Sequence, residues 1–60
     1  MDDVQKISNY INERINYWKE AVKNEKNERM KDWTNGQIFE DTKILKHIRD
    51  EYGIIPNNEQ

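Results

Sequence analysis

His47 is the only histidine in the sequence and the residue type best suited to proton transfer near neutral pH. Asp50 follows it by three positions, and such a pair on a helix supplies two potential metal ligands. The sequence offers no third ligand at a matching spacing. Charged residues lie one helical turn before and after His47, at Lys43 and Glu51. This pattern predicts that His47 is an exposed histidine among charged side chains on the helix surface.

The other residues that could do chemistry also lack partners at suitable spacing. Ser8 has no histidine or lysine placed to activate its hydroxyl. The chain has no cysteine, no glycine-rich phosphate loop, no zinc motif and no EF-hand pattern. We therefore expect no catalytic, metal or cofactor-binding residues, no cofactor, and a protein that is not an enzyme.

Four cations could instead follow a nucleic-acid backbone. If the first helix is long, these residues lie on or near one side of it: Lys19, Lys23, Lys26 and Arg29. Acidic residues interleave with them, and the chain carries a formal net charge of −2. Nucleic-acid binding is therefore the alternative, and protein binding is the leading hypothesis.

Apolar residues at steps of three and four predict a helix that begins at Asp2 or Asp3 and ends near residue 32. The stripe comprises Val4, Ile7, Ile11, Ile15, Trp18 and Val22. Arg14 falls inside it, and we expect its stem to cover apolar surface while the guanidinium stays in water. Residues 23–29 contain no apolar side chain, so a polar linker in this stretch is the competing interpretation.

The strongest local signal lies at residues 33–36. Thr34 and Gln37 have the spacing of a capping box, and Trp33 and Ile38 have that of a hydrophobic staple. These pairs predict a hinge at 33–36. The Asn-Gly pair within it would suit a β-hairpin, but the alternating strands that a β-hairpin requires are missing.

A second helix is predicted from about residue 35 to residue 52. Gly53 suits a left-handed C-cap, and Pro56 prevents the helix from continuing. Residues 54–60 are expected to be a frayed tail. The fold class that follows is all-α, a single domain over residues 1–60 built as an antiparallel two-helix hairpin.

The apolar arc on each helix is wider than one neighbouring helix can cover. We therefore expect two hairpins to pair as a homodimer, a four-helix bundle with one shared core, although a higher oligomer is also open. The predicted self-association core is Ile7, Ile11, Ile15, Trp18, Ile38, Leu45, Ile48 and Tyr52. Tyr10, Tyr17 and Phe39 lie on its edges and are the candidate interface for another protein.

The function that these patterns favour is a small, non-catalytic regulator or inhibitor that binds a larger bacterial protein. Heavy use of asparagine, lysine and isoleucine suggests a bacterial or phage source. The first residues resemble no signal peptide, so the expected location is the cytoplasm, that of the host if a phage encodes the protein, with no membrane association. The alternatives are a small DNA-associated regulator and a purely structural assembly subunit.

Overall fold

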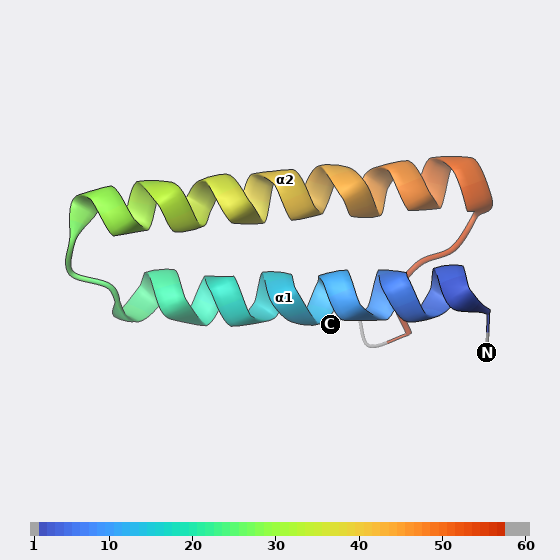
Figure 1. The fold of residues 1–60 in the computed structure, drawn as a ribbon, viewed down its shortest axis with the longest axis horizontal. Helices are drawn as coiled ribbons and strands as arrows, with labels where there is room; N and C mark the ends of the chain where they lie inside the picture. The colour runs from blue at the N-terminus through green and yellow to red at the C-terminus, as the bar shows by residue number, and fades with distance from the viewer. Residues whose placement is uncertain (1, 58–60) are drawn as a thin grey trace.

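The computed structural model describes residues 2–57, which form two α-helices and no strand. Helix α1 spans Asp3–Asn24, and helix α2 spans Glu28–Tyr52. The helices run antiparallel, side by side, over an elongated shape of 38 × 17 × 16 Å (Figure 1). The prediction of an all-α antiparallel hairpin is therefore confirmed. Within the described residues, neither helix has the length and apolar content needed to cross a membrane.

The start of α1 agrees with the sequence. Asp2 is the N-cap, and its Oδ1 accepts a hydrogen bond from the backbone nitrogen of Val4 at 2.8 Å. An aspartate at this position satisfies one of the free amides of the first turn and favours the positive end of the helix dipole.

The connection between the helices lies at residues 25–27, so the predicted hinge at 33–36 and the predicted first helix to residue 32 are wrong. Glu25 is extended and ends α1, and its Oε1 accepts from the backbone nitrogens of Lys26 and Asn27, both at 3.0 Å. Asn27 is the N-cap of α2, with Oδ1 accepting from the nitrogens of Arg29 and Met30. The interpretation of this polar stretch as a linker was the better one.

The Thr34–Gly36 segment stays helical because tertiary contacts outweigh its local capping signal. Thr34 is buried between the helices, and the ring of Trp33 meets that of Trp18 on α1. A glycine inside a helix costs only about 1 kcal/mol relative to alanine, so Gly36 alone cannot end α2. Among the described residues, positive φ occurs only at Gly53.

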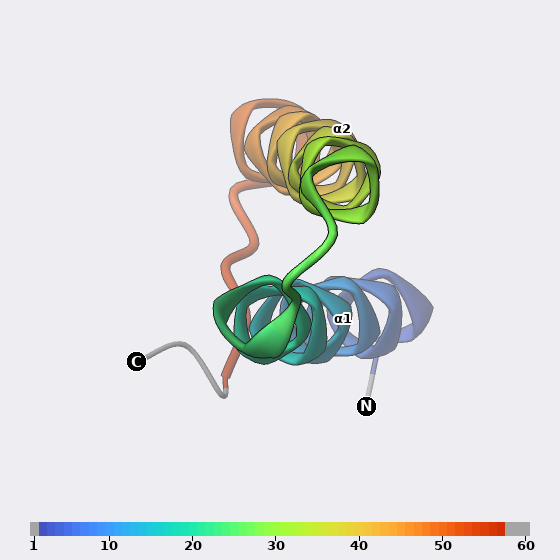
Figure 2. The ribbon, with the colours of Figure 1, turned by 90° about the vertical axis from the view of Figure 1, so that its left-hand side faces the viewer.

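The end of α2 follows the prediction, whereas the segment after it does not. Gly53 adopts φ 66°, and its N–H donates to the carbonyl oxygen of Arg49 at 2.9 Å. Residues 54–57, which we call the strap, then return along one side of the helix pair (left in Figure 2). Pro56 is buried in this segment, so the expected frayed tail is wrong for residues 54–57. Residues 58–60 lie outside the described part of the chain.

Two side-chain amides of α1 hold the strap by its backbone. Gln5 Nε2 donates to the carbonyl oxygen of Ile55 at 2.8 Å and to Asn9 Oδ1 at 3.1 Å. Asn9 Oδ1 also accepts from the backbone nitrogen of Asn57 at 2.8 Å. An extended segment therefore docks on this side of α1 without forming regular secondary structure.

The core between the helices is thin. Its buried apolar members are Ile11, Ile15 and Ile48, with Val4, Ile38, Leu45 and Ile54 packed against them. Five predicted self-association residues are thus already used within one chain: Ile11, Ile15, Ile38, Leu45 and Ile48. In one chain these five pack between the two helices of the same hairpin. Their place in a core shared by two copies stays a prediction.

Candidate protein-binding surfaces

Several large apolar side chains of α1 remain exposed on one flank of the helix. Ile7, Tyr10 and Tyr17 are 51%, 60% and 67% exposed. They recur at steps of three and seven residues, which places them along the same side of a helix with 3.6 residues per turn. Arg14 lies between the two tyrosines on that flank.

Helix α2 contributes two exposed apolar residues to the same side of the hairpin. Trp33 and Ile44 are separated by eleven residues, about three helical turns, and therefore share one flank of α2. The flanks of the two helices are joined by Trp18, whose ring meets that of Trp33 edge-on, with centroids 5.6 Å apart. We call this surface the aromatic face and define it by Ile7, Tyr10, Tyr17, Trp33 and Ile44.

The strap lies on the other side of the hairpin from the aromatic face. Its polar anchors Gln5 and Asn9 are on the flank of α1 away from Tyr10 and Tyr17, by projection at 3.6 residues per turn. Figure 2 shows the strap on one side of the helix pair only. Within residues 2–57, no segment of the chain crosses the aromatic face.

An ion pair joins the two helices beside the aromatic face. Arg14 Nε lies 3.3 Å from Asp41 Oδ2, and the Asp41 side chain is only 5% exposed, against 39% for Arg14. Asp41 Oδ2 accepts no hydrogen bond within the described chain, so charge rather than hydrogen bonding defines the contact. The guanidinium also stands over the Tyr10 ring, 5.9 Å from its centroid. The sequence placed Arg14 correctly in the stripe, but it pointed to no partner.

Trp18 contacts two aromatic rings of the face. Its ring lies 5.1 Å from that of Tyr17 and 5.6 Å from that of Trp33, both edge-on. Such edge-to-face pairs stabilise a fold by more than the burial of their apolar surface alone. Trp18 Nε1 is buried and has no hydrogen-bond acceptor within residues 2–57.

Phe39 does not join the two tyrosines. It is 62% exposed, yet it lies five residues from Ile44, about 140° around α2. The ammonium group of Lys43 stands 5.2 Å from its ring centroid. The structure therefore brings Tyr10 and Tyr17 together with Trp33 and separates Phe39 from them. Tyr52, at the end of α2, is also exposed.

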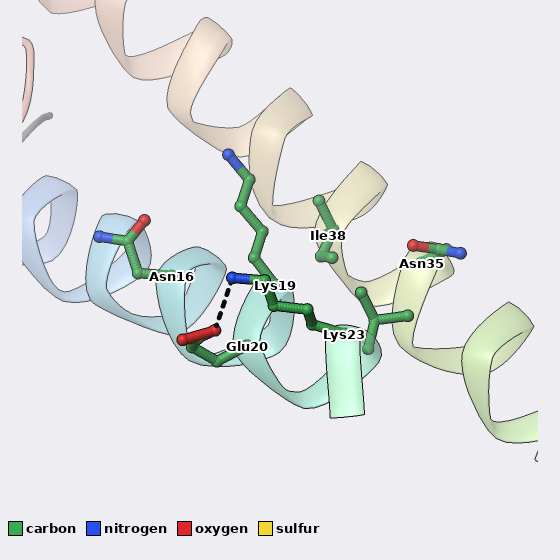
Figure 3. A pocket seen from close by; sticks show the side chains of 7 residues that line it. Asn16, Lys19, Glu20, Lys23, Asn35 and Ile38 are labelled. Carbon is green, nitrogen blue, oxygen red and sulfur yellow. Dashed lines mark ion pairs between the residues drawn. The ribbon is translucent and has the colours of Figure 1, made fainter. Parts of the chain in front are cut away.

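A second surface is a groove of about 780 Å³ between the helices, near the turn. Val22 and Ile38 contribute its half-buried apolar surface. Its polar rim consists of Asn16, Lys19, Glu20, Lys23 and Asn35. Figure 3 shows Lys19 reaching from α1 toward α2, while Lys23 pairs with Glu20 at 3.6 Å.

The predicted nucleic-acid strip is not a continuous helical surface. Lys19 and Lys23 lie on α1, but α1 ends at Asn24. Lys26 belongs to the turn, and Arg29 to the first turn of α2. The strip depended on a helix running through residue 32, so the break at residues 25–27 removes its geometric basis.

The titratable cluster around His47 is exposed, as the sequence predicts. His47 lines a small surface depression of about 220 Å³ with Lys43, Lys46 and Asp50. The hydrogen bond from Lys46 Nζ, at 2.8 Å, lowers the pKa of Asp50 below its ordinary value of 3.8, with help from the charges of Lys46 and Arg49. Within the described residues, no three histidine or acidic side chains form a group that could hold a metal ion.

Comparison with known proteins adds no family to these observations. No family model, curated protein or solved structure matches the chain at a significant level.

Proposed function

We propose that this chain is a non-catalytic regulator or inhibitor that binds a larger bacterial protein and works as a homodimer. The observation that carries the proposal is the aromatic face, which we assign to self-association. It gathers five of the nine large apolar residues that the described chain exposes. Tyrosine, tryptophan and arginine, which meet here, are the residue types that dominate binding energy at protein interfaces.

The thin core supports self-association as part of this function. Within residues 2–57, the buried hydrophobic core between the helices consists of three isoleucines, and small domains of this kind usually need a further source of stability. Two aromatic faces packed together form a four-helix bundle in this proposal. A two-fold interface brings a surface against its own copy, so an uncompensated charge there would repel itself. Asp41 offsets the charge of Arg14 within each chain.

Self-association is tested by sedimentation at micromolar concentration. The wild type is expected at twice the chain mass of 7.4 kDa, with a melting temperature that rises with concentration. Ile44→Glu should abolish the dimer, whereas Phe39→Glu, an equal change at an exposed site on another flank, should preserve it. A wild-type monomer whose melting temperature does not depend on concentration would refute the dimer.

Binding to a larger protein is tested by capture from bacterial lysate with quantitative mass spectrometry. One defined protein should be enriched by the wild type and by Phe39→Glu. Recovery of nuclease-sensitive material without a defined protein would instead support the DNA-associated alternative. The dimer measurement is independent of this result, so each half of the proposal can fail alone.

A further inference from the structure

The strap supplies a physical precedent for a second binding surface. It is an extended segment, and α1 holds its backbone with the amides of Gln5 and Asn9 while Pro56 is buried. Side-chain amides can both donate to and accept from a peptide backbone, so they suit any extended segment whatever its side chains. The strap therefore shows that side-chain amides on this side of the hairpin can bind an extended peptide segment.

The groove near the turn repeats the same chemistry farther along that side. Asn16 is seven residues after Asn9, about two helical turns, and therefore on the same flank of α1. Asn35, on α2, also lines the groove, at the opposite end from Asn16 (Figure 3). The side chains of Asn16 and Asn35 form no hydrogen bond with other residues of the described chain, so both amides are available to a ligand.

The charges around the groove select the kind of peptide. Lys19 forms no ion pair within residues 2–57, and Lys23 is balanced by Glu20 alone. The rim therefore has a surplus positive charge, although the whole chain has a formal net charge of −2. Below the rim, Val22 and Ile38 offer an apolar patch large enough for a side chain. Ligand sites commonly combine such a patch with a few polar groups that fix orientation.

We infer that the groove lined by Asn16, Lys19, Val22, Lys23, Asn35 and Ile38 binds an extended acidic segment of the partner protein, with one apolar side chain against Val22 and Ile38. This rests on the proposed function and names the chemistry of the partner. The groove and the aromatic face lie on different sides of the hairpin, so the dimer presents two such grooves. Nucleic acid is the less suited polyanion, because the floor is apolar and Glu20 stands on the rim.

The test uses the dimer of the 60-residue chain and a synthetic pentapeptide with leucine between two pairs of aspartates. The peptide should shift the side-chain amide resonances of Asn16 and Asn35, and its affinity should fall as salt is raised. Replacing the leucine by serine should weaken binding, because the apolar contact is lost. Lys19→Glu should weaken it about tenfold, equal to about 1.4 kcal/mol.

Lys43→Glu is the matched control, since it changes the net charge equally on the outer side of α2. It should bind the peptide nearly as well as the wild type. An equal loss of peptide affinity in both variants would mean that only the net charge of the protein matters, and it would overturn the inference. Tighter binding of single-stranded oligothymidylate than of the peptide would also overturn it. Absence of peptide binding in an intact dimer that still captures its partner would reject the groove and leave the proposed function standing.

Discussion

The indole rings of Trp18 and Trp33 meet edge-to-face across the two helices, with planes at 87° and centroids 5.6 Å apart. This contact lies on the half of the hairpin nearer the turn, beyond the buried Ile11, Ile15 and Ile48 of the core. It therefore adds a contact between the helices beyond these three buried side chains. The same pair explains why α2 already exists at residue 33, where the sequence predicts a hinge.

A double-mutant cycle on Trp18 and Trp33 should reveal their coupling. Changing both to leucine should cost less than the sum of the single changes by about 0.5–1.5 kcal/mol, the usual value for an aromatic pair. Urea unfolding at a fixed protein concentration measures the free energies. The Trp18 and Phe39 substitutions should be additive, because Phe39 lies on a different flank. Strict additivity for the two tryptophans would contradict the contact.

The N-cap of α2 gives a second prediction. Asn27→Ala should lower the free energy of unfolding by about 1 kcal/mol, because it removes the acceptor for the nitrogens of Arg29 and Met30. Asn35→Ala is the control: Asn35 is exposed inside α2, where alanine is the better helix former. If Thr34 were the N-cap, Asn27→Ala would leave the melting temperature unchanged. Such a result would support a hinge at 33–36 and contradict the turn at 25–27.

The two glycines should respond oppositely to alanine. Gly36→Ala should stabilise the protein by about 0.5–1 kcal/mol, because Gly36 is helical and a Cβ there meets nothing within 4 Å. Gly53→Ala should destabilise it by about 1–2 kcal/mol, because φ is +66° and L-residues are strained in that region. Chemical denaturation compares the two, and a shift of the same sign for both would contradict these backbone conformations.

Asp50 provides a prediction for pH. Its pKa in the folded protein lies below 3.8, chiefly because of the hydrogen bond from Lys46. A lowered folded-state pKa favours the fold above the unfolded value, and this contribution is lost as the pH falls through the folded pKa. Carboxyl-detected NMR should show Lys46→Gln raising the pKa of Asp50, whereas Lys43→Gln should leave it unchanged. A value insensitive to Lys46 would mean that the ion pair does not form in solution.

The sequence predicts the helix faces and both outer caps, but not the turn. Asp2 and Gly53 were identifiable because their end signals coincide with the limits of the apolar stripes. The turn was misplaced because Thr34 and Gln37 resemble a cap locally, whereas the contacts of Trp33 and Thr34 with the rest of the fold are long-range. The available signal was Asn27 followed by Glu28, an N-cap residue before an acidic first turn.

Site prediction shows the same division. Exposed Tyr10 and Tyr17 follow from their spacing on one helix. Three other features depend on the register between the helices. They are the placement of Trp33 on the same face as the tyrosines, the burial of Asp41 beside Arg14, and the groove lined by Asn16 and Asn35. A turn eight residues earlier than predicted changes that register, so residue pairs across the hairpin could not be derived from periodicity alone.

The strap also has a consequence for the order in which the molecule assembles. A three-residue turn lets α1 and α2 meet early, since short loops close at little entropic cost. The strap's bonds to Gln5 and Asn9 join residues 50 and 48 positions apart, and they have a docking surface only after the helices have paired. The strap is thus the last element to close and the first to open, and amide exchange in the native protein should be faster at Asn57 than in the middle of either helix.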